Sequence, residues 1–251
     1  MIELLAPAKL TWFLEVTGRR DNGLHELRAE MVTLDFADRL ELDEAGDFLR
    51  VEGPYSVVPL DENNLVTRAL RLVQRRAGVT LHKIIPPGGG LGGGSADAGA
   101  ILRWAGSVSA ETALTLGGDV PFCQQGGRAL VEGVGERVSE RPFEARKVTL
   151  VLTNFGLGTR EVYSAFDELV ESGVRPSGRN HLEAAARAVE PRLATTMDWL
   201  RTTLGDQVHL AGSGSTLFID GHLESDLVTW DAMGPEGMVQ FRQTVTTPKQ
   251  A

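Results

Sequence analysis

Residues 86–98 read Pro-Pro-Gly-Gly-Gly-Leu-Gly-Gly-Gly-Ser-Ala-Asp-Ala, with glycine at six of the seven positions from 88 to 94. So many glycines leave the backbone N–H groups uncovered and allow positive φ, so that the chain can curl around an anion. The small residues 95–100 suit the first turns of a helix, whose N-terminus would add its dipole to the same anion. The stretch therefore predicts a phosphate-binding loop that leads into a helix. A flexible linker is the alternative, but linkers are usually polar on both sides, and this loop lies between two apolar patterns.

The loop fits neither of the two common phosphate motifs. A Walker A loop carries lysine directly before its Ser or Thr, whereas here Gly94 precedes Ser95 and no lysine is near. A dinucleotide-binding fingerprint can be placed on residues 88–93, but no early βαβ unit supports it. Phosphate charge must then be offset by the helix dipole, by Mg²⁺, or by a lysine that the fold brings in. Ser95 itself either contacts a phosphate or the metal, or only caps the helix.

Composition narrows the class of protein. The chain has 251 residues, of which 42% are hydrophobic, so it suits one large domain or two small ones that share a cleft. Its net charge of −9 argues against nucleic acid or an anionic membrane as a partner. Cys123 is the only cysteine, which excludes an intrachain disulfide and a thiolate metal cluster. The first seven residues carry Glu3 rather than a basic lead, and no apolar run approaches about 18 residues, so we expect a cytoplasmic protein.

Hydrophobic periodicity predicts strands and helices in both halves, which indicates an α+β fold rather than a doubly wound parallel sheet. The expected strands are residues 10–16, 28–34, 39–42, 79–85, 128–132 and 148–153, a pair around 211–215, and 239–245. The expected helices begin at Asn63 or Asn64 and end near residue 76, then cover 94–105, a short segment from Ser109 to Gly117-Gly118, 160–171, 181–187 and 191–204. The polar stretch 139–147 contains Pro142 and separates two apolar regions, so it predicts domains 1–143 and 144–251.

Three separated segments resemble one known family. Residues 6–10 (Ala-Pro-Ala-Lys-Leu), 86–96 and 210–215 (Leu-Ala-Gly-Ser-Gly-Ser) are similar to the three motifs of the GHMP kinases, a superfamily of small-molecule kinases. Residues 17–26, 116–122, 132–136 and 180–183 follow in the family's order and resemble the branch whose acceptor is a diphosphocytidyl ester of methylerythritol.

The resemblance implies the GHMP kinase fold, with a ribosomal-protein-S5-like N-terminal domain, a ferredoxin-like C-terminal domain and an active site between them. It implies ATP as the phosphoryl donor and Mg²⁺ as its counterion. The implied reaction phosphorylates the 2-hydroxyl of the methylerythritol moiety in non-mevalonate isoprenoid biosynthesis.

The same resemblance assigns roles to individual residues. Asp119 matches the catalytic base, and Lys9 matches the lysine beside the reacting hydroxyl, where a cation would keep Asp119 ionised and attract the γ-phosphate. His25 matches a histidine that contacts the cytosine of the substrate, and Tyr163 would stack on that cytosine. The implied ATP-binding residues are Pro87, Gly88, Gly89, Gly90, Leu91, Gly92, Gly93, Gly94, Ser95 and Ala96, and the implied substrate-binding residues are Thr11, Leu24, His25, Thr159, Tyr163, Gly212, Ser213 and Gly214. No residue is predicted to be a metal ligand.

Two positions depart from the family's pattern. Leu24 stands where members typically carry a tyrosine that forms one side of an aromatic sandwich on cytosine, and leucine offers apolar contact without a π-face. Thr11 replaces an asparagine and lacks its amide. Two alternatives therefore stay open, a GHMP kinase for a different alcohol and a nucleotide-binding paralogue without catalysis, although the intact Lys9 and Asp119 argue against the second. The sequence is compatible with a monomer or a homodimer.

Overall fold

The structure is a computed structural model that describes residues 1–224 and 227–249. These residues form one 11-stranded sheet and seven helices, which confirms the α+β prediction. The strands are β1 (Ile2–Arg19), β2 (His25–Asp43), β3 (Leu49–Glu52), β4 (Gly78–His82), β5 (Arg128–Gly133), β6 (Arg137–Glu140), β7 (Lys147–Leu152), β8 (Val208–Leu210), β9 (Leu217–Asp220), β10 (Thr229–Gly234) and β11 (Gly237–Thr247). The helices are α1 (Leu65–Leu72), α2 (Gly93–Trp104), α3 (Ala110–Leu114), α4 (Val120–Gln125), α5 (Thr159–Glu171), α6 (Glu183–Val189) and α7 (Pro191–Leu204).

The long strand β2 organises the sheet because it pairs with four other strands. It pairs with β1 along its length, with β5 near its start, with β4 near its end and with β11 in between. The two strands predicted at residues 28–34 and 39–42 are therefore one strand. The sequence does not indicate this continuity, because Asp38 is buried like Phe36 before it but is charged. The alternation of apolar residues is therefore interrupted at residue 38.

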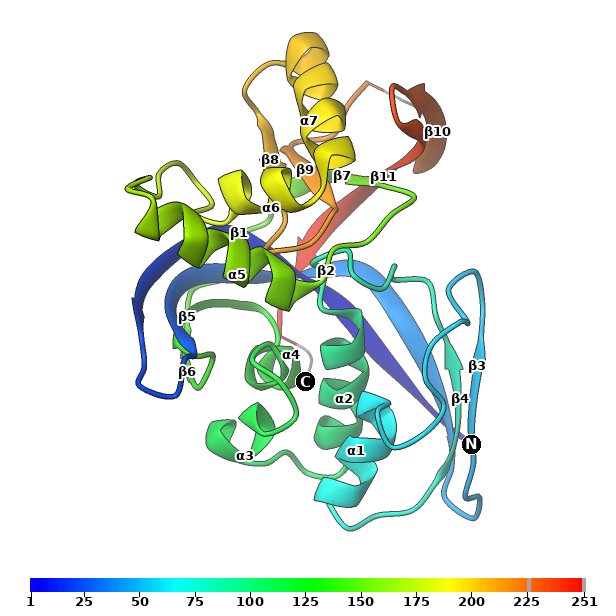
Figure 1. Cartoon of the computed structure of the whole chain (residues 1–251). Coiled ribbons are helices and arrows are strands. Elements are labelled where there is room, and N and C mark those ends of the chain that lie inside the picture. The colour runs from blue at the N-terminus through cyan, green and yellow to red at the C-terminus, as the bar shows by residue number, and fades with distance from the viewer. Residues whose placement is uncertain (225–226, 250–251) are drawn as a thin grey trace.

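The helices gather at two places on the sheet (Figure 1). Helices α1 to α4 lie beside the part formed by β1, β2, β4 and β5, with α2 between α1 and α4. Of the other three helices, α7 packs against β8, α6 against α7, and α5 against α6, in front of β1 and β2 in this view. Strand β11 pairs with β7 on one edge and with β2 through Thr246 and Thr247, so it ties the two parts together. The domain boundary at residues 143/144 falls in the irregular stretch between β6 and β7 and remains a prediction.

Two predicted helix starts are confirmed by their capping bonds. The Asn64 side chain accepts a hydrogen bond from the Val66 N–H at 2.9 Å, and Ser109 Oγ accepts one from the Thr112 N–H at 3.2 Å. Helix α1 nevertheless ends at Leu72 rather than near residue 76. The chain turns at Gln74, which has φ of +54°, and Gly78 begins strand β4 instead of ending the helix.

Four elements have no counterpart in the sequence prediction: β3, α4, β6 and β10. Each contains only four to six residues, which is too short for a helical or a strand period to stand out. Within residues 1–224 and 227–249, no helix is both long and apolar enough to cross a membrane.

Candidate active site

The glycine loop interlocks with the second glycine-rich turn of the chain. The N–H groups of Ser215 and Thr216 donate to the carbonyls of Gly88 and Gly89 at 3.3 and 3.2 Å. Gly90 has φ of +75°, and a Cβ on it would lie 2.1 Å from the carbonyl oxygen of Ala211. Glycine is thus required here because two backbones meet, in addition to any need to approach a ligand.

The loop ends at the N-terminus of α2, where Gly92 is the N-cap. Gly92 has φ of +66° and supplies no side-chain hydrogen bond, so the first N–H groups of the helix are not capped by a side chain. Such N–H groups and the helix dipole favour an anion. Ser95 lies inside the helix and is not its N-cap, which corrects the alternative that it only caps the helix.

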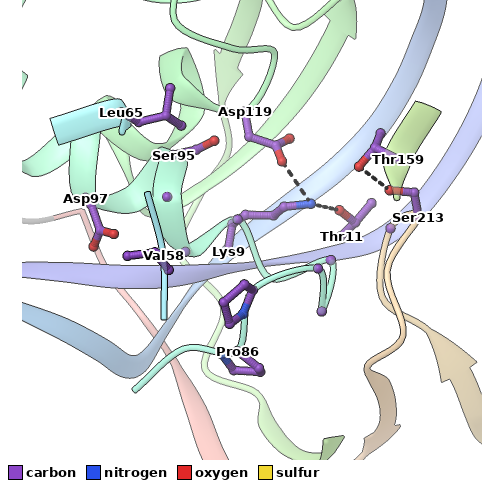
Figure 2. Close-up of a pocket in the computed structure, with 18 of the residues that line it drawn as sticks. Lys9, Thr11, Val58, Leu65, Pro86, Ser95, Asp97, Asp119, Thr159 and Ser213 are labelled. Carbon is purple, nitrogen blue, oxygen red and sulfur yellow. Dashed lines mark hydrogen bonds and ion pairs between the residues drawn. The ribbon is translucent and has the colours of Figure 1, made fainter. Parts of the chain in front are cut away.

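Lys9 and Asp119 meet beside this helix end, as Figure 2 shows. Lys9 Nζ lies 3.3 Å from Asp119 Oδ2 and donates to Thr11 Oγ1 at 3.0 Å. The lysine side chain is 6% exposed, whereas the Asp119 side chain is 33% exposed. A buried cation therefore supports a carboxylate that remains open to a ligand.

Local structure explains how both side chains reach this position. Strand β1 changes register between Pro7 and Lys9 and again between Thr11 and Phe13, and such bulges re-aim side chains. The Lys9 N–H also donates to the carbonyl of Leu91 at 3.0 Å, which fastens the strand to the glycine loop. Asp119 is the N-cap of α4, but its side chain makes no capping hydrogen bond and remains available to Lys9.

Two cavities meet at this pair. The first, of about 400 Å³, runs along the glycine loop, and the second, of about 910 Å³, extends toward α5 and the turn between β1 and β2. The residues that line both are Leu27, Met31, Ser95, Asp119, Thr159 and Tyr163. A ligand in one cavity can therefore meet a ligand in the other at Asp119.

The second cavity contains a compact aromatic and ionic group. The rings of His25 and Tyr163 stack with centroids 4.7 Å apart, and His25 Nε2 lies 2.6 Å from Asp167 Oδ1. The other oxygen of Asp167 lies 3.1 Å from Arg19 Nη1. Leu24 also lines this cavity and is 51% exposed. Burial raises the pKa of the Tyr163 hydroxyl, and the charge of Asp119 adds to that effect.

Most of the predicted residues come together around the two cavities. Thr159 accepts a hydrogen bond from Ser213 at 3.2 Å where α5 meets the turn after β8, and Gly212 lies beside them in the first cavity. Three predicted residues do not line either cavity: Leu91 and Ala96 are buried, and Gly214 packs against the backbone of Gly90.

The fold brings a second lysine, besides Lys9, close to the glycine loop. Lys83 follows strand β4, and its Nζ lies 2.8 Å from where a Cβ on Gly93 would stand. Its ammonium is ion-paired with Asp38, and with Asp97 Oδ2 at 2.9 Å. Sequence reasoning missed this cluster because its members are far apart in the chain and belong to no motif that we compared. A lysine three residues before Pro86 was the one available signal.

Charges within the cluster alter its proton affinities. Burial acts to lower the pKa of Lys83, but the charges of Asp97 and Asp38 outweigh it and hold that pKa above its usual value. Burial raises the pKa of Asp97 to about 7, although Lys83 acts in the opposite direction. Among residues 1–224 and 227–249, no group of three or more His, Cys, Asp or Glu side chains gathers that could hold a metal ion.

Comparison with known proteins adds a family to this geometry. Residues 64–127 match the GHMP kinases N terminal domain. The chain is 38% identical to the 4-diphosphocytidyl-2-C-methyl-D-erythritol kinase of Deinococcus radiodurans, over 85% of this chain and 82% of that protein. It is 33% identical to the kinase of the same name from a Polaromonas species, over 95% of this chain and 88% of that protein.

Solved structures show the same relationship. A crystal structure of 4-(cytidine 5'-diphospho)-2C-methyl-D-erythritol kinase matches with a TM-score of 0.68 and 29% identity, and each chain is covered completely. Mevalonate kinase of L. major matches with a TM-score of 0.60 over 100% of this chain and 97% of that chain. Since its identity is 14%, this second likeness bears on the fold alone.

Proposed function

Because the chain belongs to the family of 4-diphosphocytidyl-2-C-methyl-D-erythritol kinases, a branch of the GHMP kinases, we propose that it phosphorylates this substrate with ATP. The acceptor would be the 2-hydroxyl of the methylerythritol moiety, and the pathway would be non-mevalonate isoprenoid biosynthesis. Since ATP and a cytidine diphosphate ester are cytoplasmic metabolites, we propose that the chain acts in the cytoplasm.

The observation that carries this proposal is the partly exposed Asp119 carboxylate at the junction of the two cavities. Phosphoryl transfer depends mainly on positioning and charge neutralisation, with one group to receive the hydroxyl proton. We assign that group to Asp119: the proton passes to its carboxylate, the acceptor oxygen bonds to the γ-phosphorus, and the bond to the ADP oxygen breaks. Lys9, whose ammonium lies 3.3 Å from the Asp119 carboxylate, attracts the negative charge of the transferring group.

The glycine loop is the proposed site of the ATP phosphates. Its uncapped helix N-terminus supplies N–H donors and a favourable dipole. Mg²⁺ prefers oxygen ligands and usually keeps several waters, so the Ser95 hydroxyl and the Asp119 carboxylate, which line the first cavity, would suit it without a dedicated cage. When bound, the ion would neutralise phosphate charge.

The second cavity is the proposed site of the cytidyl group. Its volume of about 910 Å³ is within the range of small-molecule sites. A cytosine there could pack on the stacked His25 and Tyr163 rings, with Leu24 as an apolar neighbour. Thr159 and Ser213 lie where this cavity joins the first and are suited to the acceptor's polar groups.

A substrate panel tests the proposal. We expect Mg²⁺-dependent ATP consumption with the diphosphocytidyl-methylerythritol substrate and none with mevalonate, homoserine or galactose. Turnover with only one of the other alcohols would favour a GHMP kinase of different specificity, which the leucine at position 24 and the threonine at position 11 would then explain. Tight ATP binding without turnover of any alcohol would contradict the kinase assignment.

A further inference from the structure

Glu136 lies outside both cavities but connects two segments that line the second one. It is the last residue of the turn between β5 and β6, and its side chain is 17% exposed. Its Oε1 lies 2.5 Å from Arg20 Nη2, in the turn between β1 and β2, and its Oε2 accepts the Val134 N–H at 2.7 Å. Figure 1 shows the two turns side by side at the left of the view, although residues 20 and 136 are 116 positions apart in the chain.

The β5–β6 turn packs directly against the loop that carries Asp119. Gly135 has φ of +116°, and a Cβ on it would lie 2.1 Å from the carbonyl oxygen of Gly118. A Cβ on Gly118 would lie 3.0 Å from the carbonyl oxygen of Val134. Two backbones therefore touch here, and residue 135 must be glycine for them to do so. Because Gly118 directly precedes Asp119, a shift of the β5–β6 turn would displace the proposed base.

The same carboxylate also supports the end of the β1–β2 hairpin (residues 20–25). Strand β5 pairs with β2 only from Leu27 onward, so Leu24 and His25, which line the second cavity, lie beyond the last residue that β5 holds. The Arg20 N–H donates to the Leu24 carbonyl at 2.8 Å, so Arg20 is part of the same turn. Through the Arg20 guanidinium, Glu136 therefore holds the hairpin end that β5 does not reach.

Charge strengthens this link. Burial acts to raise the pKa of Glu136, but hydrogen bonds from Arg20, from its own N–H and from the Val134 N–H outweigh it and hold that pKa below its usual value. The carboxylate is thus ionised at neutral pH, and a charge-assisted hydrogen bond is stronger than a neutral one. Arg20 Nε also lies 2.9 Å from Glu26 Oε1, but Glu26 belongs to β2, so this second ion pair stays within the hairpin.

We propose that Glu136 is a positioning residue that fixes the separation between Asp119 and the hairpin end. An acceptor that binds at both places must match this separation with the distance between its nucleotide end and its reacting hydroxyl, so the span of the acceptor determines specificity. A misplacement of about 1 Å can lower a reaction rate by about 10²-fold, so a small change in the separation is costly. The inference rests on the proposed function, in which the cytidyl group lies in the second cavity and Asp119 is the base.

Steady-state kinetics of Glu136→Gln test this role. The amide keeps the size of the side chain but removes its charge and leaves one acceptor oxygen in place of two. We expect kcat/KM for the cytidyl substrate to fall about 10- to 100-fold, as for a lost hydrogen bond to a charged group, through a higher KM and a lower kcat. KM for ATP should stay at the wild-type value. A variant that is only less stable would instead contain less active protein, which lowers kcat and leaves both KM values unchanged.

Glu26→Gln is the matched control, because it makes the same change beside the same guanidinium. Its kcat and both KM values should stay within about twofold of the wild type, as for an exposed ion pair. Arg20→Gln removes the link from its more exposed partner and should reproduce the effect of Glu136→Gln, so it keeps the test decisive if Glu136→Gln does not fold. In the double variant of residues 20 and 136 the losses should not add, because each substitution removes the same link.

Several results would overturn the inference. These are wild-type kinetics in Glu136→Gln, a lower kcat with both KM values unchanged, additive losses in the double variant, or an equal loss in Glu26→Gln. Any of these together with normal turnover of the cytidyl substrate by the wild-type protein would leave the proposed function intact. A wild-type protein that does not phosphorylate this substrate would contradict the proposed function, and this inference with it.

Discussion

Asp119 combines two properties that a general base needs, an ion pair with a buried lysine and access to a ligand. We predict that Asp119→Asn lowers kcat by about 10²-fold or more, because the amide cannot take up the hydroxyl proton. ATP affinity should change little, since the phosphates would be held mainly by backbone N–H groups. Steady-state kinetics with an ATP titration measure both quantities. A variant with unimpaired kcat would mean that the base is another residue.

A substitution at Leu24 can test whether the second cavity holds the cytidyl group, as proposed, because this residue is half exposed and lines that cavity. Leu24→Tyr would supply a π-face, and we predict that KM for the cytidyl substrate falls by about three- to tenfold. The matched control Leu24→Met keeps an apolar side chain without a ring and should give no such gain. KM for ATP should remain unchanged in both. If KM for the cytidyl substrate is unchanged in Leu24→Tyr, the cytosine of the substrate does not lie against residue 24.

At the scale of elements, the junction between the glycine loop and the 211–216 turn holds the site together. A Cβ at Gly90 would lie 2.1 Å from the Ala211 carbonyl, and the φ of +75° adds strain of about 1–2 kcal/mol. We predict that Gly90→Ala lowers both the free energy of unfolding and the affinity for ATP. Denaturant titration and calorimetry measure the two effects.

Gly173 provides the control for this substitution. It has φ of +93°, and a Cβ there would meet nothing within 4 Å. Gly173→Ala should therefore show the conformational strain alone, without loss of ATP affinity. Equal effects of the two substitutions would mean that the contact between the loops contributes nothing.

Elements also differ in how well sequence reveals them. Helix α1 was predictable because Asn64 caps it, and α5 and α7 because 13 and 14 residues repeat their apolar positions often enough to define a face. Helix α4 has six residues, and the side chain of its N-cap residue makes no capping hydrogen bond, so neither signal exists. Its position matters nonetheless, because it carries Asp119 at its first turn.

At the scale of the whole molecule, the buried Asp97 and the partly buried His209 make the free energy of unfolding depend on pH in opposite directions. Burial raises the pKa of Asp97 from 3.8 to about 7, although Lys83 acts in the opposite direction. Between these two values the folded chain holds a proton on Asp97 that the unfolded chain has lost. The contribution of Asp97 to the free energy of unfolding therefore declines as the pH rises from about 4 to 7. Burial, with Arg179 and Arg201 nearby, lowers the pKa of His209 to about 4 from 6.5, so its contribution increases with pH up to about 6.5.

Comparison of the wild-type protein with the Asp97→Asn variant isolates the contribution of Asp97 to the free energy of unfolding. Because the asparagine does not titrate, the stability of the wild type relative to this variant should decline between pH 4.5 and 7.5. The free energy of unfolding from denaturant titrations at several pH values measures this difference. A difference that is flat or rises with pH would show that Asp97 does not hold its proton in the folded chain.

The α+β class, the main helices and strands, and the glycine-rich loop that leads into a helix could be predicted from the sequence alone, because glycine content, caps and apolar periods are local properties of the chain. The sequence also indicated, through the family resemblance, that Lys9 and Asp119 belong together, and the structure brings them within 3.3 Å. Two features became visible only in the folded chain: β2 is one strand with four partners, and Lys83, Asp38 and Asp97 form a buried cluster beside the loop. The reason is physical: strand partners and buried ion pairs depend on which distant segments pack together, and no local pattern of residues records that.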